Sequence, residues 1–368
     1  MTSAEKLNRC LTNAPVKDRR DIPVHAQMIT YCGVCAGIPQ KEIHRSNKKF
    51  QEAVKKTYET VGVPDADYVM NPGDTCFSEG LPVRRPGIEL GDNELFQFEE
   101  VVNLQPEEYD LIAKDGWDGW YNRYMCKIQK PPFKSNLQLT LRFIKLGMQG
   151  SSNIKFKRGL GAEPIFSIAA LPAFDTLSLV RSFGEFIMDL YEDGDRVKAA
   201  IDRATPDIIA STLKNASRSD IKRIGFFAMR SDANSISPAI FEEFSFPSLK
   251  QSIEAFWKAG YTTVLHADGN WLPMLEKFTE LPKNSVHFEF DSVTDLRKAY
   301  DIVGGWHSMR GDVSASMLSF AEPDEVSAYC EGLVQDLGMK GGFMLGSGCE
   351  VPMTAKAENV RRMIQAVR

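Results

Sequence analysis

The residues best suited to chemistry in this sequence are a histidine, an aspartate and a cysteine that lie at the ends of apolar segments. In His266-Ala-Asp268, the spacing of two places both side chains on one face of a strand. Cys349 follows a short apolar run inside the glycine-rich stretch Gly341–Pro352. Imidazole, carboxylate and thiolate donors together suit zinc in an open tetrahedral site. We therefore predict a metal site made of His266, Asp268 and Cys349.

Further polar side chains at strand ends complete the predicted site. Glu289 and Glu350 are candidates for the fourth position at the metal, which water or substrate could also take. The predicted catalytic residues are His266, Asp268, Glu350 and Asp232, acting as metal ligands or, without metal, as acids and hydrogen-bond donors. We expect the substrate to be bound by His25, Gln27, Asn71, Arg230, Glu289 and Asp312.

Each of these residue types also has a purely structural use. A single histidine at a strand end is more often a hydrogen-bonded structural group than a ligand, and a buried cysteine usually acts as a small hydrophobe. Cys32-Gly-Val-Cys35 could be redox-active or bind metal, but no partner pair follows it downstream, so we favour helix packing.

The apolar pattern predicts the elements that would position the site. Short apolar runs alternate with helical segments, the clearest of which is Leu249–Ala259 with one apolar face. Further helices are expected over residues 3–12, 46–60, 175–192 and from residue 354 onward. The predicted strands are Ile22–Met28, Asp65–Met70, Pro164–Ala170, Arg223–Met229, Thr262–His266, Val286–Phe290, His307–Asp312 and Gly341–Leu345.

Eight such alternations predict an α/β fold, specifically a (β/α)8 TIM barrel that forms a single domain over residues 1–368. In this fold the carboxyl ends of the strands carry the active site, which is where the candidate residues fall. Residues 72–160 break the alternation and are expected to be a long insertion after the second strand, partly hairpin (82–104) and partly helix. Its Trp117, Trp120 and Tyr121 could line a ligand pocket or simply pack the insertion.

The composition limits the class of protein. The net charge of −5, with no basic block, argues against nucleic acid as a partner. The sequence has no run of about 18 apolar residues, so no membrane span is expected. A polar N-terminus and seven scattered cysteines are typical of a cytoplasmic protein with reduced thiols.

Seven short segments, in order, give the chain a family likeness. It resembles the uroporphyrinogen decarboxylase superfamily, whose members are (β/α)8 barrels, and residues 80–150 match least well. The matching segments are Phe174–Leu177, Arg181–Tyr191, Ile236–Phe244, His266–Asn270, Met309–Val313, Gly341–Pro352 and Glu358–Val360.

Two differences from the patterns of this superfamily indicate to which of its branches the chain is most similar. True decarboxylases carry arginines after the first strand that clamp the porphyrinogen carboxylates, whereas Val24–Gly33 has none, so that activity is not expected. The cobamide-dependent methyltransferases are the other large branch. Those that act on thiols hold zinc with His-x-Cys and a later Cys; here Asp268 replaces the first cysteine. A harder His/Asp/Cys site would suit activation of an oxygen instead.

The resemblance therefore implies a methyltransferase that works with a separate corrinoid protein and has zinc as its expected metal. The preferred direction is demethylation of a small methyl donor, such as an aryl methyl ether, onto cob(I)alamin. Three alternatives stay open: methyl transfer from the corrinoid to a thiol or tetrahydrofolate, decarboxylation of a smaller acid by a lyase, and a non-catalytic corrinoid-binding partner.

Overall fold

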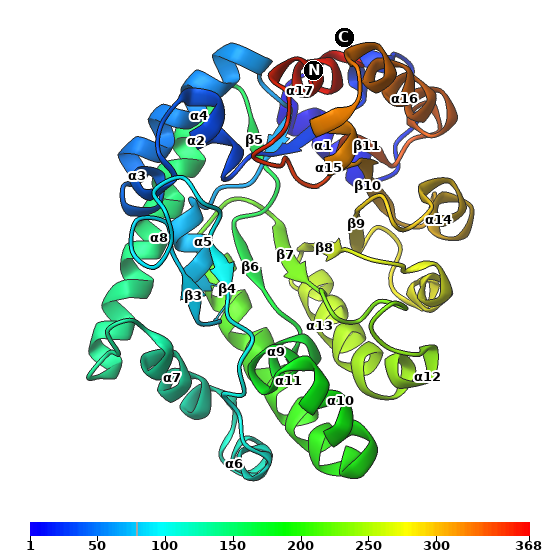
Figure 1. Cartoon of the computed structure of the whole chain (residues 1–368). Coiled ribbons are helices and arrows are strands. Elements are labelled where there is room, and N and C mark those ends of the chain that lie inside the picture. Colours follow the sequence, from blue (N-terminus) through cyan, green and yellow to red (C-terminus); the bar gives the residue numbers. More distant parts are fainter. Residues whose placement is uncertain (79) are drawn as a thin grey trace.

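A parallel sheet of nine strands forms the centre of the protein in the computed structural model, which describes residues 1–78 and 80–368 (Figure 1). Along the sheet the strand order is β5-β2-β1-β11-β10-β9-β8-β7-β6, and each neighbouring pair is parallel. The strands are β1 (Val24–Gln27), β2 (Ala66–Asp67), β5 (Glu163–Pro164), β6 (Ile168–Ala170), β7 (Arg223–Phe227), β8 (Thr262–Ala267), β9 (Val286–Phe290), β10 (Ser308–Val313) and β11 (Phe343–Glu350).

The two edges of this sheet are joined by the chain itself. Edge strands β5 and β6 are separated only by residues 165–167, so the predicted strand 164–170 is two short strands. Arg223 of β7 bridges the interruption, because its Nε donates to the carbonyl of Ile165 (2.7 Å) and its Nη2 to that of Pro164 (2.8 Å). The sheet therefore curls into a barrel-like shape, as the predicted α/β barrel requires.

Helices cover the outside of the sheet (Figure 1). They are α1 (Ser3–Leu11), α2 (Tyr31–Ala36), α3 (Gln40–Arg45), α4 (Asn47–Val61), α9 (Ala173–Arg181), α10 (Phe183–Glu192), α11 (Gly194–Ala216), α12 (Pro238–Ile240), α13 (Phe246–Lys258), α14 (Leu296–Val303), α15 (Ala315–Phe320), α16 (Pro323–Asp336) and α17 (Ala357–Gln365). Short 3-10 turns lie at Arg19–Asp21, Leu272–Glu280 and Gly338–Lys340, and a π-turn at Phe241–Ser245.

Most predicted helices are confirmed, and one is corrected. The expected helix over 175–192 is two helices, α9 and α10, because Ser182 between them has a φ of 69°, which a continuous helix does not allow. Cys32 and Cys35 lie in the short helix α2, where the Cys32 thiol donates to the carbonyl of Met28 (3.2 Å). Cys32 also belongs to the buried apolar cluster and Cys35 packs against it, so the expectation of helix packing at this cysteine pair is confirmed.

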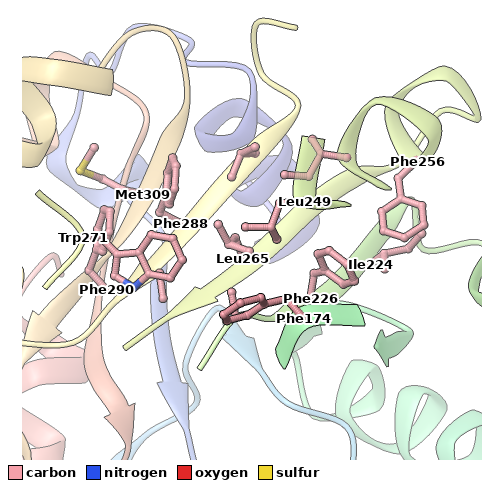
Figure 2. Packing of buried hydrophobic residues seen from close by; sticks show 14 of the residues in the cluster. Phe174, Ile224, Phe226, Leu249, Phe256, Leu265, Trp271, Phe288, Phe290 and Met309 are labelled. Atoms are coloured by element: carbon pink, nitrogen blue, oxygen red, sulfur yellow. The ribbon is translucent and has the colours of Figure 1, made fainter. Parts of the chain in front are cut away.

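The apolar residues of the central strands pack outward against the helices. Phe288 and Phe290 of β9 stack on each other, and Phe278 of the neighbouring 3-10 turn meets Phe288 edge-on. Figure 2 shows Phe288 and Phe290 near Leu265, Trp271 and Met309, and all five belong to one continuous apolar cluster. Burying one such side chain completely stabilises the fold by about 1.5–3 kcal/mol, so this outer layer holds the strands in place.

The segment 72–160 contains helices and a small ribbon. It comprises α5 (Pro72–Ser78), the antiparallel strands β3 (Val83–Arg84) and β4 (Gln97–Phe98), α6 (Pro106–Asp115), α7 (Trp117–Ile128) and α8 (Asn136–Gly159). The hairpin and the helices were expected within this segment, whereas its being an insertion stays a prediction. Trp117 and Trp120 are buried and pack on each other and on Tyr121 and Tyr124. Trp117 and Trp120 therefore pack the interior of this segment, which was one of the two interpretations given for them.

Among the described residues, no helix combines the length and the apolarity needed to cross a membrane.

Candidate active site

The candidate metal ligands lie at the carboxyl ends of two strands, β8 and β11. His266 is the penultimate residue of β8, and Asp268 follows the last one. The predicted strand ends at Leu345, but β11 runs on through the glycines, and Cys349 and Glu350 are its last two residues. Gly346 lets it do so, because a Cβ there would lie 2.6 Å from the carbonyl oxygen of His25 on β1. Glycine therefore permits the close strand pairing that carries Cys349 to the site.

His266, Asp268 and Cys349 meet as predicted. The Nε2 of His266 lies 3.3 Å from Oδ2 of Asp268 and 3.6 Å from Sγ of Cys349. Sγ of Cys349 lies 3.6 Å from the same Oδ2. One donor atom from each residue thus falls within 4.8 Å of the others. In the part of the chain that the structure describes, these three form the one group of histidine, cysteine and acidic side chains arranged in this way.

The donor set fits a divalent cation. It offers one nitrogen, one sulfur and one carboxylate, which is the mixture that zinc accepts in three-ligand sites. Oδ1 of Asp268 is buried without a hydrogen-bond partner, so the second carboxylate oxygen is also available to bind a cation. His266 is buried, whereas the Asp268 side chain is 35% exposed, so the group opens to solvent on the Asp268 side. An additional ligand or a substrate can approach from there.

Glu289 of β9 holds the imidazole from behind. Its Oε2 lies 3.2 Å from Nδ1 of His266, and the hydroxyl of Tyr68 donates to the same oxygen (2.5 Å). His25 places its Nδ1 3.3 Å from the other oxygen, Oε1. With Nδ1 facing this carboxylate, His266 directs Nε2 at Asp268 and Cys349, which is how metal-binding histidines are usually oriented. Glu289 thus contacts the ring nitrogen opposite to the donor nitrogen.

The charges in this region compensate one another. Burial alone would raise the pKa of Glu289, but the positive charge of Arg310 and the nearby imidazoles of His25 and His266 hold that pKa well below its usual range. Burial lowers the pKa of His266, yet the adjacent Asp268 and Cys349 raise it well above its usual range. The three donors therefore favour one positive charge among them, which a bound cation would also supply.

Glu350 and Gln27 lie beside this group on paired strands. Gln27 of β1 is in register with Glu350 of β11. Oε1 of Glu350 accepts hydrogen bonds from the backbone nitrogen (2.6 Å) and the hydroxyl of Thr30, and burial raises the pKa of Glu350 to about 6. Oε1 of Gln27 is buried without a partner. Within the described residues, neither Glu350 nor Glu289 joins the group of three donors, although both were candidates for its fourth position.

The side chains of Asn71 and Asp232 accept hydrogen bonds within their own or adjoining segments. The Oδ1 of Asn71 accepts from the backbone nitrogen of Asp74 (2.9 Å) at the start of α5. The carboxylate of Asp232 accepts from the backbone nitrogens of Asn234 (2.8 Å) and Asn270 (3.2 Å) and from Ser235. Both side chains therefore shape segments at the carboxyl edge of the sheet, and these hydrogen bonds do not reach His266, Asp268 or Cys349.

Arg230 and Asp312 also bind to neighbouring segments. The guanidinium of Arg230 pairs with Glu100 (3.1 Å) and donates to the carbonyl of Ser178, which ties β7 to the segment 72–160. Asp312 accepts a hydrogen bond from the hydroxyl of Tyr329 on α16 (2.5 Å). Burial raises the pKa of Asp312.

Two residues around the donor group were not predicted, Tyr68 and Arg310. Both are buried and both contact Glu289. Arg310 had a recognisable signal, because it alternates with Asp312 along a strand that is otherwise apolar or small. A charged residue in a buried parallel strand needs a counter-charge. The sequence could therefore have indicated that Arg310 has a partner of opposite charge inside the sheet.

Comparisons with known proteins agree with this architecture. The family model for uroporphyrinogen decarboxylase (URO-D) matches residues 161–368. A methyltransferase from Methanosarcina mazei has a similar fold, with a TM-score of 0.71 and 17% sequence identity over 100% of this chain and 98% of that one. A search of curated protein sequences found no match.

Proposed function

This chain belongs to the uroporphyrinogen decarboxylase (URO-D) family, and from that premise we propose that it is a methyltransferase acting with a corrinoid carried by a separate protein. The observation that carries the proposal is the meeting of His266, Asp268 and Cys349 at the carboxyl ends of β8 and β11. The fold shared with the Methanosarcina methyltransferase supports it. We further propose that the resident metal is zinc.

The donor set favours a methyl ether as the methyl donor. Asp268 contributes a hard oxygen ligand, so the group has one thiolate and keeps Lewis acidity that a thiolate-rich site would lose. Such a site suits polarisation of an oxygen on the substrate. We propose that the substrate is a small methyl donor such as an aryl methyl ether. In the reaction its O–CH3 bond breaks, the methyl group bonds to cob(I)alamin with the cobalt electron pair, and the released oxygen takes up a proton.

The residues of this chain have separate tasks in that reaction. A zinc ion, when bound, would act as a Lewis acid that makes the substrate oxygen a better leaving group. His266, Asp268 and Cys349 would hold it, and Glu289 would keep the His266 ring turned toward it through Nδ1. The exposed side of Asp268 leaves room for the substrate oxygen.

The first test is the metal content of the purified protein. We expect one zinc ion per chain in the wild type and a loss of zinc in Cys349→Ala, because the variant removes the thiolate. Cys35→Ala is the matched control, since Cys35 is also partly exposed but lies in the Cys-x-x-Cys helix. Zinc that stays in Cys349→Ala and leaves with Cys35→Ala would move the metal site to that helix.

The second test is turnover. The protein is mixed with chemically reduced cobalamin and an aryl methyl ether, and methylcobalamin is followed by its absorption. We expect its formation with the wild type and a loss of at least tenfold in rate with Cys349→Ala. Formation of a methyl thioether or methyltetrahydrofolate from methylcobalamin, with no reaction of the ether, would replace the demethylase proposal by the opposite direction.

A further inference from the structure

A buried arginine, Arg310, lies between the strands that carry the candidate metal ligands. It belongs to β10, which pairs with β9 on one side and β11 on the other. The side chain has no solvent exposure. Burying a guanidinium completely lowers the stability of the fold unless its N–H groups find acceptors or a counter-charge. The contacts of Arg310 therefore indicate its role.

One end of Arg310 binds the backbone just before Cys349. Its Nη1 donates to the carbonyl of Ser347 and its Nη2 to that of Gly348 (3.3 Å). These two residues immediately precede Cys349 on β11. A planar guanidinium that binds two successive carbonyls fixes their direction, and thereby the direction of the next side chain.

The other end of Arg310 faces the group that orients His266. Its Nε lies 3.6 Å from Oε1 of Glu289, an ion-pair distance, and Oε2 of Glu289 contacts Nδ1 of His266. Arg310 thus joins the Cys349 strand to the His266 ring through a single intermediate carboxylate. It touches none of the three donor atoms directly.

The glycine-rich sequence makes room for this arrangement. A Cβ at position 346 would lie 3.0 Å from both Cγ and Cδ of Arg310. The aliphatic stem of Arg310 therefore crosses β11 at the place where the strand has no side chain. Gly346 serves Arg310 as well as the pairing with β1.

From these contacts we infer that Arg310 is a positioning residue, which sets the Cys349 thiol and the His266 imidazole at the spacing that a metal ion needs. The inference rests on the proposed function, since it concerns the same metal site. It adds that the site depends on a side chain that is not a ligand.

The chain offers a matched control in Arg223. This arginine is also buried in the sheet, binds two backbone carbonyls (Ile165 and Pro164) and pairs with a carboxylate, Glu163 (3.0 Å). It lies at the first position of β7 and contacts none of the donor group. Removing it should destabilise the fold without altering the metal site.

The test uses Co²⁺ as a probe in the metal-free full chain. A thiolate bound to Co²⁺ gives a charge-transfer absorption, which reports the Cys349–metal bond independently of activity. We expect this band in the wild type and in Arg223→Met, and none in Cys349→Ala. In Arg310→Met we expect a weakened band and a Co²⁺ affinity lower by about 10- to 100-fold. Arg310→Lys keeps the charge but not the paired donors, so its Co²⁺ affinity should lie between those of the wild type and Arg310→Met.

The outcomes separate the two proposals. Circular dichroism checks that each variant is folded. If Arg310→Met does not fold, Arg310→Lys is used in its place. A wild-type band and affinity in the folded Arg310 variants would overturn the positioning role and leave the metal site intact. An equal loss in Arg223→Met would also overturn it, because the effect would then be general destabilisation. Failure of the wild type to bind Co²⁺ would overturn the metal site and the role of Arg310 together.

Discussion

The two faces of β9 are built for different purposes. On one face Phe288 and Phe290 pack against rings from the surrounding helices and turns. On the other, His287 and Glu289 lie inside the curled sheet, where Glu289 meets Arg310 and two histidines. The alternation of side chains along a strand separates these faces completely. A single five-residue strand thus contributes both to the packing layer and to the candidate site.

The inner face of β9 contributes less to the stability of the fold than the outer face. Buried charges lose hydration that their mutual attraction only partly replaces, so an apolar interior of equal volume would often be as stable or more so. The outer face gains stability with every ring it buries. We infer that the inner polar group persists because of the site that it orients. Two variants on β9 test this division, with the larger expected effect on the free energy of unfolding first, and a third variant tests the pH dependence of a carboxyl group buried in the outer layer.

The largest loss is expected from Phe288→Ala on the outer face. Removing a fully buried ring should lower the free energy of unfolding by about 3–5 kcal/mol, through lost burial and the cavity left behind. Urea denaturation of the metal-free protein measures this, and Phe288→Leu should lose less than about 1.5 kcal/mol. The zinc content of folded Phe288→Ala should match that of the wild type. Loss of zinc in the folded variant would mean that the two faces are not independent.

Glu289→Gln, one residue along, should have a smaller effect on stability and a larger one on metal. The amide keeps the shape but leaves Arg310 buried without its counter-charge, which we expect to cost about 3 kcal/mol. It also weakens the hold on His266, so zinc should be lost more easily to a chelator. Glu280→Gln, on the exposed surface, should change stability by no more than about 0.5 kcal/mol. A Glu289→Gln protein as stable and as zinc-rich as the wild type would contradict the role given to the inner face.

The third variant concerns Asp175, a carboxyl group buried in the outer layer at α9, whose effect on the free energy of unfolding depends on pH. Burial raises its pKa to about 7 from an ordinary value of 3.8. The folded state therefore holds this proton more tightly than the unfolded state, so its contribution to stability is lost as the pH rises from about 4 to 7. The slope is at most about 1.4 kcal/mol per pH unit, because one proton is involved.

Asp175→Asn should remove that slope, which unfolding measurements between pH 4 and 8 can detect. The exposed Asp202→Asn serves as the control and should follow the wild type. A constant difference between wild type and Asp175→Asn across this range would show that Asp175 does not carry the pH dependence.

The sequence was sufficient to locate the strands of the parallel sheet, because most of them contain a short apolar run bounded by turn residues. Their bounds were predicted less well: β2 covers only Ala66–Asp67 of the predicted Asp65–Met70, and the predicted strand 164–170 is two strands. The sequence was also sufficient to bring His266, Asp268 and Cys349 together once those strands were placed in a barrel-like sheet. The end of β11 was missed because Gly346 and Gly348 looked like breakers, whereas close packing requires them there. Arg310 was missed because a charged residue in a strand does not by itself reveal its partner, and Glu289 lies on a different strand.

The interruption between β5 and β6 has a consequence for how the protein moves. Between β8 and β9 five residue pairs are in register, whereas β5 and β2 share two and β6 and β7 share three. β1 and β2 share only one pair, so the seam at residues 165–167 lies in a weakly paired part of the sheet that extends from β1 to β7. Amide protons there should exchange with solvent through local opening, and those of β8 and β9 only when the whole chain unfolds. The strands that carry and orient His266 thus belong to the slowest-exchanging part of the fold.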